Sequence, residues 1–402
     1  MSLRLLPLVL GAFAIGSETF MISGVLPTIA GDLGVSPSAA GSLVTVFALA
    51  YAFGSPLLAV ASAGVERKRV LMVAMGAFAA ANLLAAFAPS FLMLVAARVL
   101  LALTAGAFMP AATAFATAMH GRAERGRAIA LIYAGMTLAT VVGVPTGTFL
   151  ANVASWRAAF LGVGALAALA VLGVAAILPR LEGAEAVGLA ERTAVARRPD
   201  VHKLLSVTTL ALLGPFAANT YLGVLIESAL GVGGVTLSGV LVFFGVVSFG
   251  GSQFGGYGAD RWPRERFIAV IFVVLIVAFA ALSLGPRWGG FWGGATVFAG
   301  LFLWGLFGWA FPIAQQARIV TLDPALASIT LSLNTSALYV GAAIGSSLGA
   351  LAVSRWSVHS VGWLAALTEL AALGLLIATS APKPRTAPDA EPVPVACLVA
   401  EE

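Results

Sequence analysis

The stretch GSPLLAVASAGVERKRVL (Gly54–Leu71) occurs a second time as GSQFGGYGADRWPRERFI (Gly251–Ile268), and the two copies align without gaps at an offset of 197 residues. Two further pairs recur in the same order at an offset of 202: Gly106 and Pro110 as Gly308 and Pro312, and Gly143 and Gly147 as Gly345 and Gly349. Three matches in one order, drifting by only five residues, indicate that the chain consists of two duplicated halves.

The composition makes a lipid bilayer the expected environment of this chain. Of its 402 residues, 60% are hydrophobic and 10% are charged, whereas soluble globular proteins have roughly half and roughly a quarter. A soluble fold could not cover so much apolar surface with so few charges. The composition therefore excludes a secreted enzyme, a nucleic-acid-binding module and a disordered regulator.

Apolar runs of about 20 residues are needed to cross the ~30 Å hydrocarbon core of a bilayer. Twelve such runs are present: Leu5–Ile29, Ala39–Ala63, Val70–Phe87, Phe91–Met119, Ala128–Val153, Ala158–Leu178, Leu204–Ile226, Thr236–Tyr257, Phe267–Leu284, Phe291–Ala314, Ala325–Val353 and Val361–Thr379. The expected fold is an all-α integral membrane protein with twelve transmembrane helices in two pseudo-symmetric six-helix bundles. We expect the N-terminal bundle at 1–178, a cytoplasmic linker at 179–202, the C-terminal bundle at 203–380 and a disordered cytoplasmic tail at 381–402.

The placement of Lys and Arg predicts the orientation in the membrane. With the N-terminus inside, 18 of the 22 basic residues fall in cytoplasmic segments, and only Arg157, Arg287 and Arg355 lie outside. Such an asymmetry is a strong positive-inside signal and predicts that both termini are cytoplasmic. The formal charge of +5 therefore indicates orientation rather than an anionic partner such as nucleic acid.

Residues that ligate metals or form disulfides are sparse. The single cysteine, Cys397, lies in the polar tail, and the three histidines (His120, His202 and His359) are far apart in the sequence. Neither a disulfide nor a thiolate metal site is available, and a histidine-based site is disfavoured. We expect no cofactor and no metal.

Small residues form a stripe in the fifth span. Gly135, Ala139, Gly143 and Gly147 are spaced by four, with Pro145 between the last two. This spacing places them on one helix face, where a second helix can approach closely. The stripe recurs in the eleventh span as Ala337, Gly341, Gly345 and Gly349. Generic helix packing and a bending or gating element both explain the stripe, and Pro145 favours the second.

The loop between the eighth and ninth spans combines an acid with basic residues. It contains Gly256, Asp260, Arg261 and Arg264, and the first-half copy has Ala63 in place of the aspartate. Asp260 could form a charge latch with Arg261 or Arg264 in one conformational state. The alternative is a solvated loop that obeys the positive-inside rule.

Charged residues within spans are costly and are functional candidates by default. Those within or at the end of a span are Glu18, Arg98, Glu227 and Glu369. Glu18 lies 13 residues past Leu5, about 20 Å from the inner face at ~1.5 Å per residue. Arg98 lies seven residues past Phe91 on a descending helix, about 10 Å below the outer face. The two can therefore pair, either as a static ion pair or as a proton-coupling site; Glu369 has no assignable partner.

Polar and aromatic residues in the seventh and tenth spans are candidates for lining a cavity. They are Asn219, Tyr221 and Trp304. Ordinary interhelical hydrogen bonding and packing are the alternative for each residue alone.

The twelve spans, the duplicated halves and the GxxxDR loop at Gly256–Arg261 resemble the major facilitator superfamily. GSETFMISGVLPTIAGDLGVS (Gly16–Ser36), GMTLATVVGVPTGTFL (Gly135–Leu150) and SWRAAF (Ser155–Phe160) resemble its bacterial drug/proton antiporter branch, which includes chloramphenicol and sugar efflux proteins. The resemblance extends from about Leu5 to Thr379.

The resemblance implies that spans one, four, seven and ten line a central cavity, so that Phe20 of span one joins the expected substrate-binding residues. It places the antiporter motif of span five on Gly143, Pro145 and Gly147. It also places the acidic position of span one on Glu18. The family's span-four arginine falls on Arg98, although Ala102 stands where a glycine is common.

The function expected from these features is proton-coupled efflux of small amphipathic molecules, such as antibiotics or metabolites, across the bacterial plasma membrane. The alternative within the same fold is a proton-coupled uptake permease for a sugar or another nutrient. A membrane-embedded enzyme is disfavoured because no cluster of His, Asp or Glu lies at one depth, and no filter-like segment indicates a channel. The expected partners are a small-molecule substrate, protons and the bilayer around a monomer.

Overall fold

The computed structural model describes residues 3–120, 124–183, 188–322 and 326–380. Within these residues all regular structure is helical, and twelve helices are long and apolar enough to cross a membrane. The prediction of twelve transmembrane helices is therefore confirmed for the described part of the chain. The predicted disordered tail at 381–402 lies outside it.

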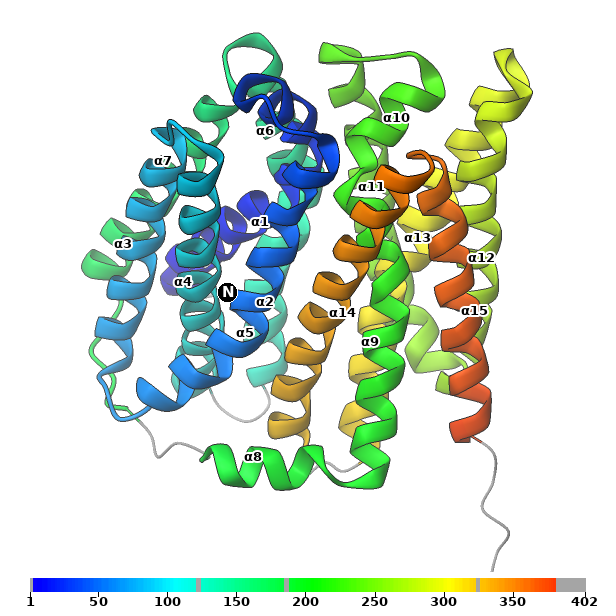
Figure 1. Cartoon of the computed structure of the whole chain (residues 1–402). Helices are drawn as coiled ribbons and strands as arrows, with labels where there is room; N and C mark the ends of the chain where they lie inside the picture. Colours follow the sequence, from blue (N-terminus) through cyan, green and yellow to red (C-terminus); the bar gives the residue numbers. More distant parts are fainter. Residues whose placement is uncertain (1–2, 121–123, 184–187, 323–325, 381–402) are drawn as a thin grey trace, which may run out of the picture.

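Two bundles of helices stand side by side, and a short helix, α8, runs beneath them (Figure 1). The first half consists of η1 (Leu3–Leu5), α1 (Leu6–Leu33), α2 (Pro37–Ala61), α3 (Arg67–Ala86), α4 (Phe91–Met119), α5 (Arg125–Leu138), η2 (Ala139–Gly143), α6 (Val144–Val153) and α7 (Trp156–Ile177). The remaining helices are α8 (Leu189–Ala196), α9 (Pro199–Thr220), α10 (Leu222–Leu230), α11 (Gly234–Arg261), α12 (Arg264–Trp288), α13 (Gly290–Leu322), α14 (Ala327–Arg355) and α15 (Ser360–Ser380). We call the end where α8 lies the linker end and the end where α1 joins α2 the far end.

Local sequence explains where several helices begin and end. Serine N-caps precede α2 and α4: the hydroxyl of Ser36 accepts a hydrogen bond from the amide of Ala39, and that of Ser90 from the amide of Met93. Such caps satisfy amides that have no partner inside the helix. α1 ends at Gly34, whose positive φ of 64° forms a left-handed cap that glycine adopts without strain.

Two predicted spans are interrupted in the structure. Span five contains the π-helical element η2 between α5 and α6. Span seven, predicted as one run over Leu204–Ile226, breaks at Tyr221, which has φ −106° and ψ 16°. The seventh spanning helix is therefore α9, and the last residues of the predicted run belong to the separate helix α10. Hydropathy reports how apolar a segment is, and it contains no information about such a break.

Each half has its own hydrophobic core, and one helix of the second half also packs into the core of the first. The buried core of the first half is built from α1 to α7, but it also includes Tyr339, Ala342 and Ala343 of α14. The second core is built mainly from α9 to α15. α14 packs along α2 of the other half, and we call this contact the α2–α14 seam.

The glycine stripes hold equivalent helix pairs together in both halves. A Cβ on Gly135 would lie 2.5 Å from the carbonyl oxygen of Val9, and one on Gly143 would overlap Ser17, so this stripe packs α1 against α5 and η2. In the second half, a Cβ on Gly345 would overlap the carbonyl of Leu213 on α9. The α1 and α5–α6 pair therefore corresponds to the α9 and α14 pair, as expected for duplicated units.

Alanine at Gly345 is expected to lower the melting temperature of the purified protein. The added methyl group would meet a helical carbonyl, which cannot turn aside as a flexible side chain can, and overpacking of this kind costs about 1–3 kcal/mol. The matched control is Gly374→Ala on α15, where nothing lies within 4 Å of the new Cβ. This control should keep or slightly raise the melting temperature, because alanine favours helix. Equal shifts for the two variants would show that the stripe is not closely packed.

Candidate functional site

Glu18 and Arg98, expected at matching depth, form an ion pair in the interior of the first half. Nη1 of Arg98 on α4 donates to Oε1 of Glu18 on α1, and both side chains are fully buried. Arg98 also contacts α2: its Nε donates to the carbonyl oxygen of Leu43 at 3.2 Å, and its guanidinium carbon lies 4.3 Å from the ring centroid of Phe47. The guanidinium therefore links three helices.

The ion pair leaves two polar atoms open. Oε2 of Glu18 and Nη2 of Arg98 are buried and have no hydrogen-bond partner among the described residues. A buried ion pair repays the cost of desolvation only if further hydrogen bonds satisfy its remaining atoms. Beyond the bond from Nε of Arg98 to Leu43, these two atoms have none among the described residues, so one carboxyl oxygen is open to a proton.

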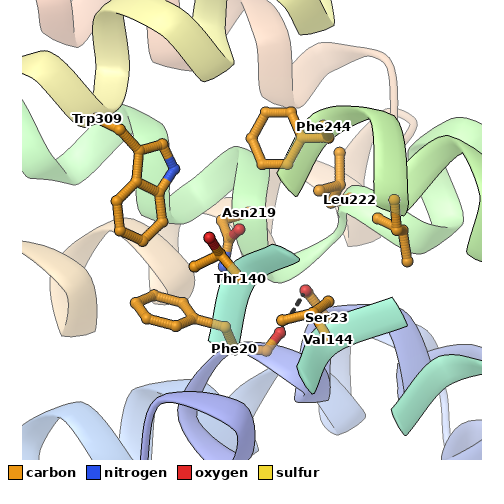
Figure 2. Close-up of a pocket in the computed structure, with 9 residues that line it drawn as sticks. Phe20, Ser23, Thr140, Val144, Asn219, Leu222, Phe244 and Trp309 are labelled. Carbon is orange, nitrogen blue, oxygen red and sulfur yellow. Dashed lines mark hydrogen bonds between the residues drawn. The ribbon is translucent and has the colours of Figure 1, made fainter. Parts of the chain in front are cut away.

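A small pocket lies between the two halves (Figure 2). Its lining residues come from α1, η2 and α6 on one side and from α9, α10, α11 and α13 on the other: Phe20, Ser23, Thr140, Val144, Asn219, Leu222, Leu241, Phe244 and Trp309. The rings of Phe20 and Trp309 meet edge to face across the boundary between the halves, with centroids 5.3 Å apart. These lining residues are apolar and aromatic apart from two hydroxyls and one amide, and none of the described residues that line the pocket is charged.

The helix α1 contributes a residue to the ion pair and also contributes residues to the lining of the pocket. Glu18 and Phe20 are two residues apart on α1, so about 200° of helical rotation separates them. Glu18 accordingly contacts α4 inside the first half, whereas Phe20 lines the pocket toward the second half. A movement of α1 would therefore change both the Glu18–Arg98 contact and the lining of the pocket.

The π-helical element lies where α1 and the second half approach each other. Thr140 lines the pocket, and a Cβ on Gly245 of α11 would overlap its carbonyl oxygen. Gly143 lies against Ser17 and Gly147 against Met21, both on α1. Pro145, just beyond η2, has no amide hydrogen to donate to the preceding turn. π-Helical turns mark functional sites frequently, and this one is packed on both sides of the boundary.

The structure separates the four expected substrate-binding residues. Phe20 and Asn219 line the pocket, whereas Tyr221 and Trp304 do not. Tyr221 is fully buried at the break between α9 and α10, and its hydroxyl donates to the carbonyl of Ser38 on α2 at 3.5 Å. Trp304 lies in the second core, 4.8 Å from Phe244 between ring centroids.

Trp309, Phe244 and Thr140 line the pocket but were not selected from the sequence. Trp309 lies five residues after Trp304 on α13, which places it about 140° around the helix. Because α13 is apolar on all sides, its sequence contains no signal that distinguishes the face toward the pocket from the face toward the core. The small-residue stripe did identify the segment that contains Thr140.

The charge latch predicted for Asp260 is not formed in this structure. Asp260 is exposed and has no ion pair among the described residues. The guanidinium of Arg261 lies over the ring of Tyr257, 4.2 Å from its centroid, and donates to its hydroxyl. Residues 257 and 261 are four apart and share a helix face, whereas adjacent residues do not. At this end Arg318 pairs instead with Glu265, at 3.6 Å, so the latch stays a prediction for another state.

Glu369, which had no assignable partner in the sequence, is fully buried in α15. Both of its carboxyl oxygens lack a hydrogen-bond partner among the described residues. Burying a carboxyl group without a partner costs free energy, both when the group is ionised and when it is neutral but makes no hydrogen bond. In the described part of the chain, no group of three or more His, Cys, Asp or Glu side chains could hold a metal ion.

Replacing Glu369 with leucine is expected to keep or raise the melting temperature, because a side chain of similar volume then fills the site without a polar group to desolvate. Thermal unfolding of the purified protein measures this effect. The matched comparison is Glu18→Leu, which leaves Arg98 buried without its partner and should lower the melting temperature. A loss of several degrees in Glu369→Leu would show that the carboxyl makes a stabilising interaction.

Comparison with known proteins identifies transporters to which this chain is similar. The family profile of the Major Facilitator Superfamily matches residues 8–325. The chain is 33% identical over 374 residues to the uncharacterised MFS-type transporter YbcL of Bacillus subtilis, covering 92% of this chain and 95% of the relative. It is also 33% identical over 383 residues to a chloramphenicol resistance protein of Streptomyces lividans, covering 94% and 96%.

The fold is shared with solved transporters. The nucleoside transporter NupG superposes with a TM-score of 0.77 over 94% of this chain and 99% of that one, at 13% sequence identity. Together with the twelve apolar helices found among the described residues, the family match makes this chain a multi-pass protein of the bacterial inner membrane and not an enzyme. The chain belongs to the major facilitator superfamily of membrane transporters.

Proposed function

We propose that this protein exports small amphipathic molecules from the bacterial cytoplasm in exchange for protons. The observation that carries the proposal is the arrangement on α1, which has Glu18, the partner of Arg98, on one face and a residue of the pocket between the halves on the other. A 33% identical relative is a chloramphenicol resistance protein, which supports efflux as the direction of transport.

The lining of the pocket fits an uncharged aromatic substrate with a few hydrogen-bonding groups. Phe20, Phe244 and Trp309 offer ring faces and edges, while Asn219 and Thr140 offer an amide and a hydroxyl. A charged substrate would enter this pocket without a counterion, since none of the described lining residues is charged, and would lose its hydration without compensation. Neutral amphipathic molecules avoid this penalty.

The contacts between the two halves support a mechanism of alternating access. Thr45 of α2 shares a 2.7 Å hydrogen bond with Ser346 of α14, and Tyr221 donates to Ser38. Both contacts lie toward the far end, which the positive-inside rule assigns to the periplasm. We assign this conformation to a state closed toward the periplasm, with Pro145 and the adjoining η2 as the element that bends when the far end opens.

The exchange itself needs only the ion pair. When the far end is open, Glu18 takes up a proton from the periplasm. When the linker end is open, the positive charge of Arg98 favours the ionised carboxylate, the proton leaves toward the cytoplasm, and substrate binds. One proton is then exchanged for one substrate molecule without any further titratable group.

Inverted membrane vesicles test the direction of transport. A panel of antibiotics is first screened for compounds that raise the melting temperature of the purified protein, and a radiolabelled hit is used as the probe. With an acidic lumen, which corresponds to the periplasm, antiport accumulates the probe inside the vesicles, and collapse of the pH gradient by nigericin abolishes the accumulation. Depletion of the probe from the lumen under the same gradient would instead establish an uptake permease.

Glu18→Gln tests the coupling residue. The variant should bind the probe with wild-type affinity and exchange labelled for unlabelled probe across the membrane, because these steps need no proton. It should no longer concentrate the probe against its gradient. Normal concentrative export by this variant would remove Glu18 from the mechanism.

A further inference from the structure

An aromatic cluster joins the two halves within the α2–α14 seam. The ring of Tyr339 on α14 stacks on that of Tyr51 on α2, with centroids 3.9 Å apart, and its centroid lies 6.3 Å from that of Phe47. All three rings are buried, with at most 7% of each residue exposed. Tyr339 is thus a residue of the second half that packs within the core of the first.

The same cluster touches the charged pair. Phe47 carries the guanidinium of Arg98 over its ring at 4.3 Å, and the carbonyl of Leu43, one turn earlier on α2, accepts the hydrogen bond from Nε of Arg98. Thr45, which bonds to Ser346 across the seam, lies between these two positions on α2. The segment of α2 that contacts α14 across the seam is therefore the same segment that contacts Arg98.

We infer that Tyr339 is a positioning residue that makes closure of the α2–α14 seam depend on the charge of Glu18. This inference rests on the proposed function, in which Glu18 binds and releases a proton. These contacts form an unbroken series from Glu18 on α1 through Arg98 on α4 and Phe47 on α2 to Tyr339 on α14. Tyr339 does not line the pocket, so its role is separate from substrate binding.

The physical basis is competition for the guanidinium. While Glu18 is ionised, Arg98 is shared between the carboxylate and the Phe47 ring. When Glu18 takes up a proton, the carboxylate's attraction is lost, and the desolvated cation interacts more strongly with the ring. Phe47 is then drawn toward α4 and away from Tyr339, so the stacked rings of Tyr339 and Tyr51 lose their contact with Phe47. Protonation of Glu18 thereby loosens the seam at the far end.

Distances between spin labels at the far end measure this effect without substrate or gradient. The single cysteine is removed by Cys397→Ser, and labels are attached after Gly31→Cys on α1 and Ser354→Cys on α14, both exposed. In full-length protein in nanodiscs, lowering the pH from 8 to 5 should raise the ratio of long to short distances about tenfold. Glu18→Gln should show the long-distance population at both pH values.

Variants of Tyr339 separate a specific link from general weakening. Tyr339→Leu should abolish the response to pH, whereas Tyr339→Phe, which keeps the ring, should retain it. Tyr51→Leu removes the same stack from the other side and should reproduce Tyr339→Leu. The control is Phe298→Leu, which removes the edge contact with Phe243 in the second half and should leave the response intact.

The outcomes of these measurements decide whether Tyr339 links the charge of Glu18 to the α2–α14 seam. Loss of the response in Tyr339→Leu and Tyr51→Leu, with retention in Tyr339→Phe and Phe298→Leu, establishes the link. A full response in Tyr339→Leu, or wild-type distances in Glu18→Gln at both pH values, overturns it. The proposed function fails separately, in the vesicle assay, if Glu18→Gln still concentrates the probe.

Discussion

Replacing Arg98 with methionine should destabilise the protein by about 3–5 kcal/mol, because removal of one partner of a buried ion pair leaves the other uncompensated. Glu18 would then stay buried only with a proton bound, so the variant should lose more stability as the pH rises from 5 to 8. Thermal unfolding of purified protein across this pH range measures both effects. Concentrative transport should be lost as well.

Two further variants define the origin of this loss. Arg98→Met combined with Glu18→Gln removes both charges and should recover much of the stability. The surface control is Arg180→Met, which removes a pair with Glu66 at 4.0 Å whose arginine side chain is 89% exposed; such exposed pairs contribute about 0–1 kcal/mol. A double variant as unstable as Arg98→Met would show that packing of the arginine stem on Phe47, rather than its charge, was lost.

Alanine at Trp309 should weaken binding of the vesicle-assay probe at least about tenfold, because the indole forms one wall of the pocket and large aromatic anchors dominate binding energies. Phe20→Ala, which removes the other ring of the edge-to-face contact, should have a similar effect. Equilibrium binding of the radiolabelled probe to purified protein measures the dissociation constants.

Trp292→Ala is the matched control, because Trp292 is on the same helix but is 74% exposed at the surface. It should bind the probe with wild-type affinity. If Trp309→Ala and Phe20→Ala also bind like the wild type, the substrate occupies a different part of the boundary between the halves, and the pocket of Figure 2 is not its site.

The ion pair shows what could be predicted about the site from sequence. The depth of a residue in the bilayer follows from its position along a helix of fixed rise, so Glu18 and Arg98 could be placed at one level before any contact was known. The open atoms on both groups and the contact of Arg98 with Phe47 depend on three helices at once, and nothing in the sequence indicated them.

The pocket shows the opposite case. Of the residues expected to bind substrate, Phe20 and Asn219 line the pocket, whereas Trp304 does not and Trp309 of the same helix does. Polar or charged residues restrict which helix face is buried, whereas an apolar helix can turn any of its faces toward a neighbour. Tyr221 lies at the break between α9 and α10, where its hydroxyl donates to the carbonyl of Ser38 on α2.

The sequence by itself determined the twelve spans, the duplicated halves and the two charges at one depth, because apolarity, repetition and helical rise are properties of segments along the chain. Only the tertiary structure decided which ring faces the pocket, that Asp260 has no ion pair with another described residue in this state, and that Tyr339 lies in the core of the other half. Those features depend on how helices from distant parts of the chain rotate against one another, and packing rather than local composition sets that rotation.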